Sequence, residues 1–266
     1  MIAIAVVAAA AVLLRPDASA PSSAPPSAAP AELIVGDGRT VTLLSLGGDD
    51  TDALLDRVAA ELGEATARVE DFWGTDWNRE ITVVATDSPT QFAAAAPGAP
   101  AGMAAVAVAD DVDLDRRVAT GQRIVLGPDA HRMSDAALRI VLAHELFHYA
   151  ARTDTAADAP RWLTEGVADY VARPAPSATT PSPVPSALPA DADFDRPEPE
   201  LSRAYDRAWR FARFLADRHG PAALRELYRR AAGPDRVPAE DALREITGAE
   251  PAALLQQWRQ WSAGPR

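Results

Sequence analysis

Apolar residues recur along the first half of the chain with two different spacings. Alternating and continuous short apolar runs predict strands, and spacings of three and four residues predict helices. The segment Gly36-Asp37-Gly38 is a turn signal between two of the strands, which indicates a β-hairpin. Strands are predicted at 32–35, 40–46, 81–85, 103–109 and 123–126, and helices at 51–72 and 88–95.

The second half carries only helical spacing. Helices are predicted at 134–152, 161–171, 201–219, 222–231, 239–246 and 251–262. Strands that alternate with helices, followed by helices alone, indicate an α+β protein. We therefore expect a small mixed sheet with helices in an N-terminal subdomain, an all-helical C-terminal subdomain, and one folded region that spans 32–266.

Two segments depart from this pattern. Residues 2–14 form an uninterrupted apolar run, which has the length of a signal-peptide core and is shorter than the roughly 20 residues of a membrane-spanning helix. We expect 1–14 to be a signal peptide or membrane anchor and 15–31 to be a Pro/Ala/Ser-rich linker, so that the protein is extracytoplasmic, either secreted or anchored. The Pro-rich stretch 173–199 is predicted to be a flexible insertion, either a flap near the site or plain disorder.

The helix at 134–152 contains His144-Glu145-Leu146-Phe147-His148, with two of the chain's 4 histidines. Four residues are just over one helical turn, so both imidazoles project from one face and can reach one metal ion. Glu145 points about 100° away from His144 around the helix axis. From there its carboxylate can act on a group bound at the open coordination position of the metal. This is the HExxH signature of zinc hydrolases. The other interpretation, a core helix with two satisfied histidines, is disfavoured because it buries an imidazole pair beside a carboxylate without a cation.

A catalytic zinc ion takes three protein ligands and a water molecule, so one more ligand is needed. Glu165 and Asp169 are four residues apart on the next predicted helix, which has Pro160 at its start. One of the two carboxylates can bind the metal, while the other accepts the second N–H group of a ligating histidine.

The segments His144–His148 and WLTEGVADYV resemble the gluzincin metallopeptidases of the thermolysin-like clan, in particular the bacterial peptidase MA-like group. The resemblance covers approximately residues 33–262, although only these two motifs are specific. It implies that His144, His148 and Glu165 bind Zn²⁺ in a cleft between the two subdomains, that Glu145 is the general base, and that Asp169 orients His144.

The same resemblance implies a residue that stabilises the oxyanion, for which Tyr205 is the first candidate and His219 the second. Each has an equally good structural explanation, Tyr205 as core packing and His219 as a cation at a helix C-terminus. His131 has no partner at metal-ligand spacing and is interpreted as a surface residue. A metzincin is disfavoured, because no third histidine follows His148 at the required spacing.

Composition narrows the range of partners. The formal net charge of −12 argues against nucleic acid or an anionic membrane surface as a partner, and the absence of cysteine excludes disulfides and thiolate ligands. We expect a peptide or protein substrate, with membrane anchoring only through the N-terminal segment; the oligomeric state is left open.

Three functions are consistent with these features. The first is an exported zinc-dependent metallopeptidase, and the second is a catalytically idle gluzincin-fold module that binds or regulates at the cell surface. The third is an extracytoplasmic structural domain without metal. The presence of Glu145 beside a complete ligand set favours the first, because a scaffold has no use for a base.

Overall fold

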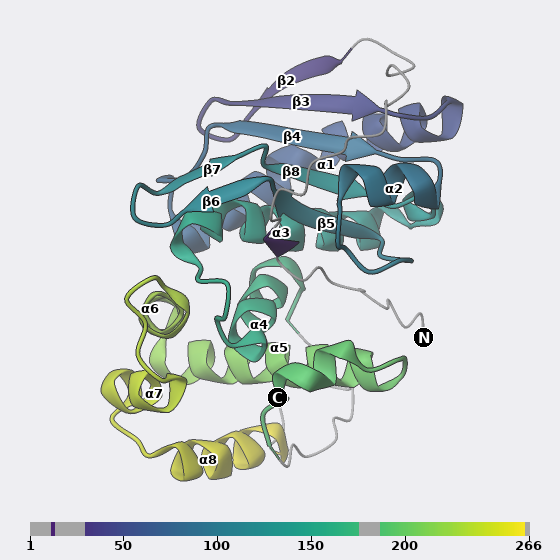
Figure 1. Ribbon diagram of the computed structural model, residues 1–266. Helices are drawn as coiled ribbons and strands as arrows, with labels where there is room; N and C mark the ends of the chain where they lie inside the picture. Colours follow the sequence, from purple (N-terminus) through teal and green to yellow (C-terminus); the bar gives the residue numbers. More distant parts are fainter. Residues whose placement is uncertain (1–11, 14–29, 176–186, 264–266) are drawn as a thin grey trace. The chain divides into compact units, whose positions relative to one another are not determined.

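A six-stranded mixed sheet organises the first part of the chain in the computed structural model, which describes residues 12–13, 30–175 and 187–263 (Figure 1). The chain divides into two units, Met1–Thr153 and Asp154–Arg266, and the sheet belongs to the first. The strand order is β1–β5–β8–β4–β3–β2. The strands are β1 (Val12–Leu13), β2 (Ala31–Val35), β3 (Arg39–Ser45), β4 (Glu80–Ala85), β5 (Ala105–Ala109) and β8 (Arg123–Leu126).

The strand pairing confirms the predicted mixed sheet. β2 and β3 form the predicted antiparallel hairpin, and its turn contains Gly36 and Gly38 at φ values of 54° and 97°. β3, β4 and β8 run parallel to one another, whereas β5 is antiparallel to β8. Helix α1 (Asp49–Trp73) makes the connection between the parallel strands β3 and β4, as such pairs require.

The sequence analysis missed a second hairpin, formed by β6 (Asp111–Asp113) and β7 (Val118–Thr120). These two strands pair only with each other. Each is three residues long, and neither has buried side chains, so the apolar alternation that marks a strand is absent.

The two faces of the main sheet are covered by different helices. Helix α2 (Pro89–Ala95) packs Phe92 against Val84, Val106 and Val125 on one face. Because side chains alternate along a strand, the alanines of β5 at 105, 107 and 109 point to the opposite face. Helix α3 (Asp135–Ala151) contacts β5 and β8, and these small side chains leave room for its close approach.

The second unit is helical, as predicted. It contains α4 (Arg161–Ala172), α5 (Glu200–His219), α6 (Pro221–Ala232), α7 (Ala239–Thr247) and α8 (Pro251–Ala263), with a short 3₁₀ helix η3 (Asp191–Asp195). Its core is aromatic: Phe211 packs edge-on against Trp162 and Trp258 at centroid distances of 5.5 and 5.0 Å. The unit therefore has a substantial core of its own.

Much of the two unusual segments lies outside the described residues. Of the predicted export segment, only Val12 and Leu13 are described, and their backbone pairs in parallel with Val108 and Ala109 of β5. Within the Pro-rich stretch, 173–175 and 187–199 are described, and η3 buries Phe194 there against Tyr205. No helix in the described part of the chain combines the length and apolarity needed to cross a bilayer.

A fully buried arginine connects the β2–β3 turn to the end of α1. Arg39 is 0% exposed and stacks 3.4 Å above the ring of Trp77. Its guanidinium group also donates to the backbone carbonyls of Thr75, Trp77 and Asn78, and its Nε lies 3.2 Å from Glu70 Oε1. A buried guanidinium is tolerated because every one of these partners offsets its loss of hydration.

The substitution Arg39→Met is expected to lower the free energy of unfolding by about 3 kcal/mol, because it leaves carbonyls and a carboxylate without their donor. Urea denaturation followed by circular dichroism measures the loss. Arg79→Met is the control. Arg79 and Arg39 both pair with Asp37, but the side chain of Arg79 is 62% exposed. The effect of this substitution is expected to stay below about 0.5 kcal/mol. Equal effects of the two substitutions would contradict this assignment.

Candidate metal centre

Helix α3 carries the HExxH segment and is almost entirely buried. Ser134 is its N-cap, and its hydroxyl accepts a hydrogen bond from the amide of Ala137. Phe147 fixes the rotation of the helix, because its ring packs edge-on against Phe72 and Trp73 at the end of α1. This packing determines which way the histidine face of α3 points.

The two histidines of the motif lie side by side, as their spacing predicts. His144 is 0% and His148 6% exposed, and their Nε2 atoms are 3.1 Å apart. Two zinc–nitrogen bonds of about 2.05 Å at a tetrahedral angle place the nitrogens about 3.3 Å apart. The pair therefore fits two corners of a zinc site. Without a metal ion, a buried imidazole pair of this kind is costly.

Glu145 lies in the same first unit and is held by the sheet. Its side chain is 1% exposed, and its Oε2 accepts a hydrogen bond of 2.9 Å from the backbone amide of Ala107 in β5. A carboxylate bound to a strand amide has a defined position next to the histidine pair. The sequence could not show this contact, because it joins residues 38 apart in the chain.

In the second unit, α4 carries Glu165 and Asp169, which are both buried. The helix packs closely on α5 at Gly166, where a Cβ atom would come within 2.7 Å of the carbonyl oxygen of Ala208. Glycine at this position therefore lets α4 pack closely against α5, at the residue that follows Glu165. His144, His148 and Glu165 are buried and have the donor types of a group that could hold a metal ion.

The sequence analysis missed a residue that binds Asp169. Arg173 Nη1 lies 3.1 Å from Asp169 Oδ2, Arg173 Nη2 donates to Asp206 Oδ1 at 2.9 Å, and the guanidinium lies 4.0 Å above the ring of Trp209. Burial by itself would lower the pKa of Arg173, but the two carboxylates outweigh it and raise this pKa above its usual value. The i,i+4 spacing of Asp169 and Arg173 on a helix was the available signal. The proposed contact of Asp169 with His144 stays a prediction.

Arg161, at the start of α4, forms a second charged contact in this unit. Its Nη1 donates to Asp195 Oδ1 at 2.6 Å, and its guanidinium lies 5.1 Å above the ring of Phe194. Burial opposes the charge, yet the hydrogen bond and the carboxylates of Asp195 and Glu165 raise the pKa of Arg161 overall. The guanidinium group of Arg161 thus places a positive charge near the carboxylate of Glu165.

The three other residues singled out from the sequence lie elsewhere in their units. Tyr205 is buried and packs edge-on against Phe194 at 5.1 Å, consistent with core packing. His219 is the last residue of α5, as its interpretation as a C-terminal cation requires. His131 lies in a 3₁₀ helix, with Nδ1 2.8 Å from the carbonyl oxygen of Pro128. The oxyanion-stabilising role of Tyr205 or His219 stays a prediction.

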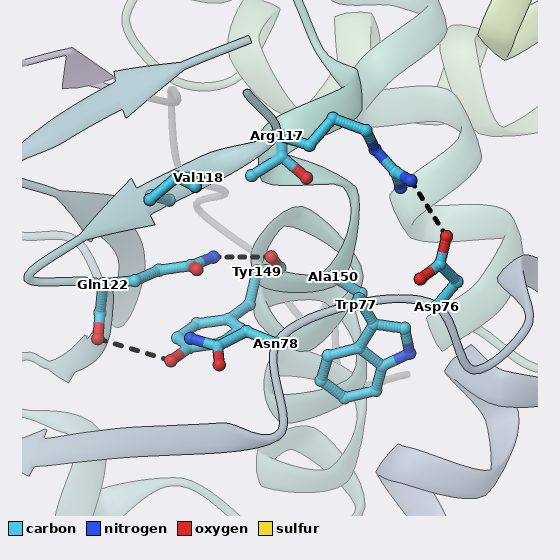
Figure 2. Close-up of a pocket in the computed structure, with 10 residues that line it drawn as sticks. Asp76, Trp77, Asn78, Arg117, Val118, Gln122, Tyr149 and Ala150 are labelled. Carbon is cyan, nitrogen blue, oxygen red and sulfur yellow. Dashed lines mark hydrogen bonds and ion pairs between the residues drawn. The ribbon is translucent and has the colours of Figure 1, made fainter. Parts of the chain in front are cut away.

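A cavity of about 310 Å³ opens in the first unit beside the end of α3 (Figure 2). Trp77 and Tyr149 contribute aromatic walls, and an ion pair of Arg117 with Asp76 lies at one side. The side-chain amide of Gln122 donates to the backbone carbonyl oxygen of Tyr149, and the hydroxyl of Tyr149 donates to the backbone carbonyl oxygen of Glu80. Burial raises the pKa of this hydroxyl. None of the predicted metal ligands lines the cavity, so it is distinct from the histidine pair.

Comparison with known proteins finds no matching protein family and no matching curated protein. Among solved structures, the chain is similar to a mutant M1 zinc metallopeptidase from Deinococcus radiodurans, with 16% identity over 89% of this chain and a TM-score of 0.48. It is also similar to a two-domain mutant M1 zinc metallopeptidase bound to L-arginine, with 17% identity over 90% of this chain and a TM-score of 0.47. The match covers 52% of each of those chains, so this chain spans about half their length.

Proposed function

We propose that this chain is a zinc-dependent metallopeptidase in which His144, His148 and Glu165 hold the metal ion and Glu145 is the general base. The observation that carries the proposal is the buried histidine pair with its Nε2 atoms 3.1 Å apart. Glu145 follows His144 directly and is anchored through Oε2. The donor set of two imidazoles and one carboxylate is the one that catalytic zinc uses in peptidases.

Bound zinc would lower the pKa of a water molecule toward neutrality and polarise the scissile carbonyl group. The residues of the chain perform the remaining tasks. The carboxylate of Glu145 accepts a proton from water and delivers it to the nitrogen of the leaving amine. The hydrogen bond from Ala107 holds this carboxylate in place, so that little reorganisation is needed when the proton moves.

Asp169 is proposed to orient His144 through the imidazole N–H that does not face the metal. The contact of Asp169 with Arg173 supports this role, since it holds the carboxylate in a defined position on its helix. The proposed substrates are peptides or proteins, and the proposed location is extracytoplasmic, with the N-terminal segment as signal peptide or anchor.

Hydrolysis of a mixed peptide library, analysed by mass spectrometry, tests the proposal. Purified protein is expected to bind one zinc ion per chain and to cleave peptides. Phenanthroline should abolish the cleavage, and added zinc should restore it. Stoichiometric zinc without any cleavage would instead favour the idle binding module. Substoichiometric zinc after incubation with excess metal would rule out the metallopeptidase and favour a structural domain.

A further inference from the structure

One residue of the sheet contacts α3 through both of its backbone polar groups. The amide of Ala107 donates to Glu145 Oε2 at 2.9 Å, and the carbonyl oxygen of Ala107 accepts a hydrogen bond of 2.6 Å from Arg152 Nη2. All three residues are buried and belong to the first unit. The carboxylate of Glu145 and the guanidinium group of Arg152 thus bind the same residue of β5.

Helix geometry explains why these two side chains reach one residue. Glu145 and Arg152 are seven residues apart, and seven steps of 100° bring the chain back to within about 20° of the starting direction. Both side chains therefore leave α3 on the face that contacts β5. Arg152 is the C-cap residue of the helix, and its long side chain can reach back toward the N-terminus, the direction in which helical Cβ atoms tilt.

The pairing of β5 with β8 does not use these two backbone groups. Ala107 is paired with Ile124 in the antiparallel ladder of β5 and β8. In such a ladder, hydrogen-bonded and non-hydrogen-bonded pairs alternate, so every second residue directs its amide and carbonyl away from the partner strand. The contacts with Glu145 and Arg152 show that Ala107 is one of these residues.

We propose that Arg152 is a positioning residue for the general base. Its guanidinium group fixes the carbonyl of Ala107, and the amide of the same residue fixes Glu145 Oε2. Because the two groups belong to one residue, a shift of β5 that releases the carbonyl also moves the amide. The guanidinium group of Arg152 keeps its charge at all relevant pH values. Its charge-assisted hydrogen bond is therefore suited to hold Ala107 in place.

The catalytic part of this inference rests on the proposed function. In the zinc-loaded protein, Arg152→Met is expected to lower kcat by about 10- to 100-fold, while KM stays within about twofold, because the substrate is bound but the base is displaced. Arg152→Lys retains a cationic donor and is expected to recover part of kcat.

Arg57→Met is the matched control. Arg57 also donates to backbone carbonyls, those of His131 and Met133 just before α3, but it does not contact Glu145 or Ala107 in the described structure. Its substitution loosens the other end of the helix and is expected to leave kcat within about twofold. Equal losses of kcat in Arg57→Met and Arg152→Met would show that Arg152 only stabilises the fold, which overturns the proposal.

A second measurement does not depend on activity. In the metal-free protein, the ¹⁵N-resolved amide of Ala107 is expected to exchange with solvent about tenfold faster in Arg152→Met than in the parent, and to move upfield as its bond to the carboxylate weakens. In Arg57→Met both observables should stay at the parent values. An unchanged Ala107 amide in Arg152→Met refutes the positioning role, even if the parent protein hydrolyses nothing. If the parent protein hydrolyses nothing but the Ala107 amide signal of Arg152→Met shifts, only the proposed function is refuted.

Discussion

The substitution Glu145→Gln is expected to lower kcat by about 10²- to 10⁴-fold, a loss of about 3–5.5 kcal/mol in transition-state stabilisation. The glutamine keeps the size of the side chain but cannot accept the proton of the attacking water. Zinc binding should persist, because Glu145 is not one of the proposed ligands. The paired measurements are kcat on a peptide substrate and the zinc content of the same preparation.

Asp135→Asn provides the control for this experiment. Asp135 lies in the first turn of α3, its side chain is 69% exposed, and it pairs with Arg57. The same exchange of carboxylate for amide on the same helix is expected to change kcat by less than about twofold. If Glu145→Gln retains the parent kcat, Glu145 is not the base and the proposed mechanism is wrong.

Removal of a proposed ligand is the second prediction with a large effect. His148→Ala and Glu165→Gln are each expected to weaken zinc binding by more than about 100-fold, beyond the 10- to 100-fold typical of residues that only orient a ligand. Each loss should also lower the stabilisation by zinc from about 4 kcal/mol in the parent protein, with free zinc at 1,000 times the parent Kd, to below about 1.5 kcal/mol in the variant at the same zinc concentration. Competition with a chromogenic chelator measures the affinity, and thermal unfolding with and without zinc measures the stabilisation.

The informative comparison is between the two ligand variants and Glu245→Gln. Glu245 belongs to the same helical unit as Glu165, but it is half-exposed and pairs with Arg230. Its substitution is expected to leave zinc affinity unchanged. Parent-like affinity in Glu165→Gln together with lost affinity in His148→Ala would keep the histidine pair as ligands and exclude Glu165 as the third.

The local patterns in the sequence predicted most of the secondary structure. Apolar periodicity located α1, α3 and α5. The hairpin β6–β7 was missed because short, polar strands bury no side chains and leave no periodic signal. Boundaries also shifted by a residue or two, since helix ends depend on caps and packing.

The sequence by itself determined the chemistry that the site could offer, because the four-residue spacing of His144 and His148 places two imidazoles on one helical face wherever that helix packs. Only the tertiary structure decided how the neighbouring groups are held. Each contact named here joins residues at least 33 apart in the chain: Ala107 with Glu145, Ala107 with Arg152, and Arg173 with Asp206 and Trp209. Such contacts depend on which faces pack together, and no local pattern encodes that choice.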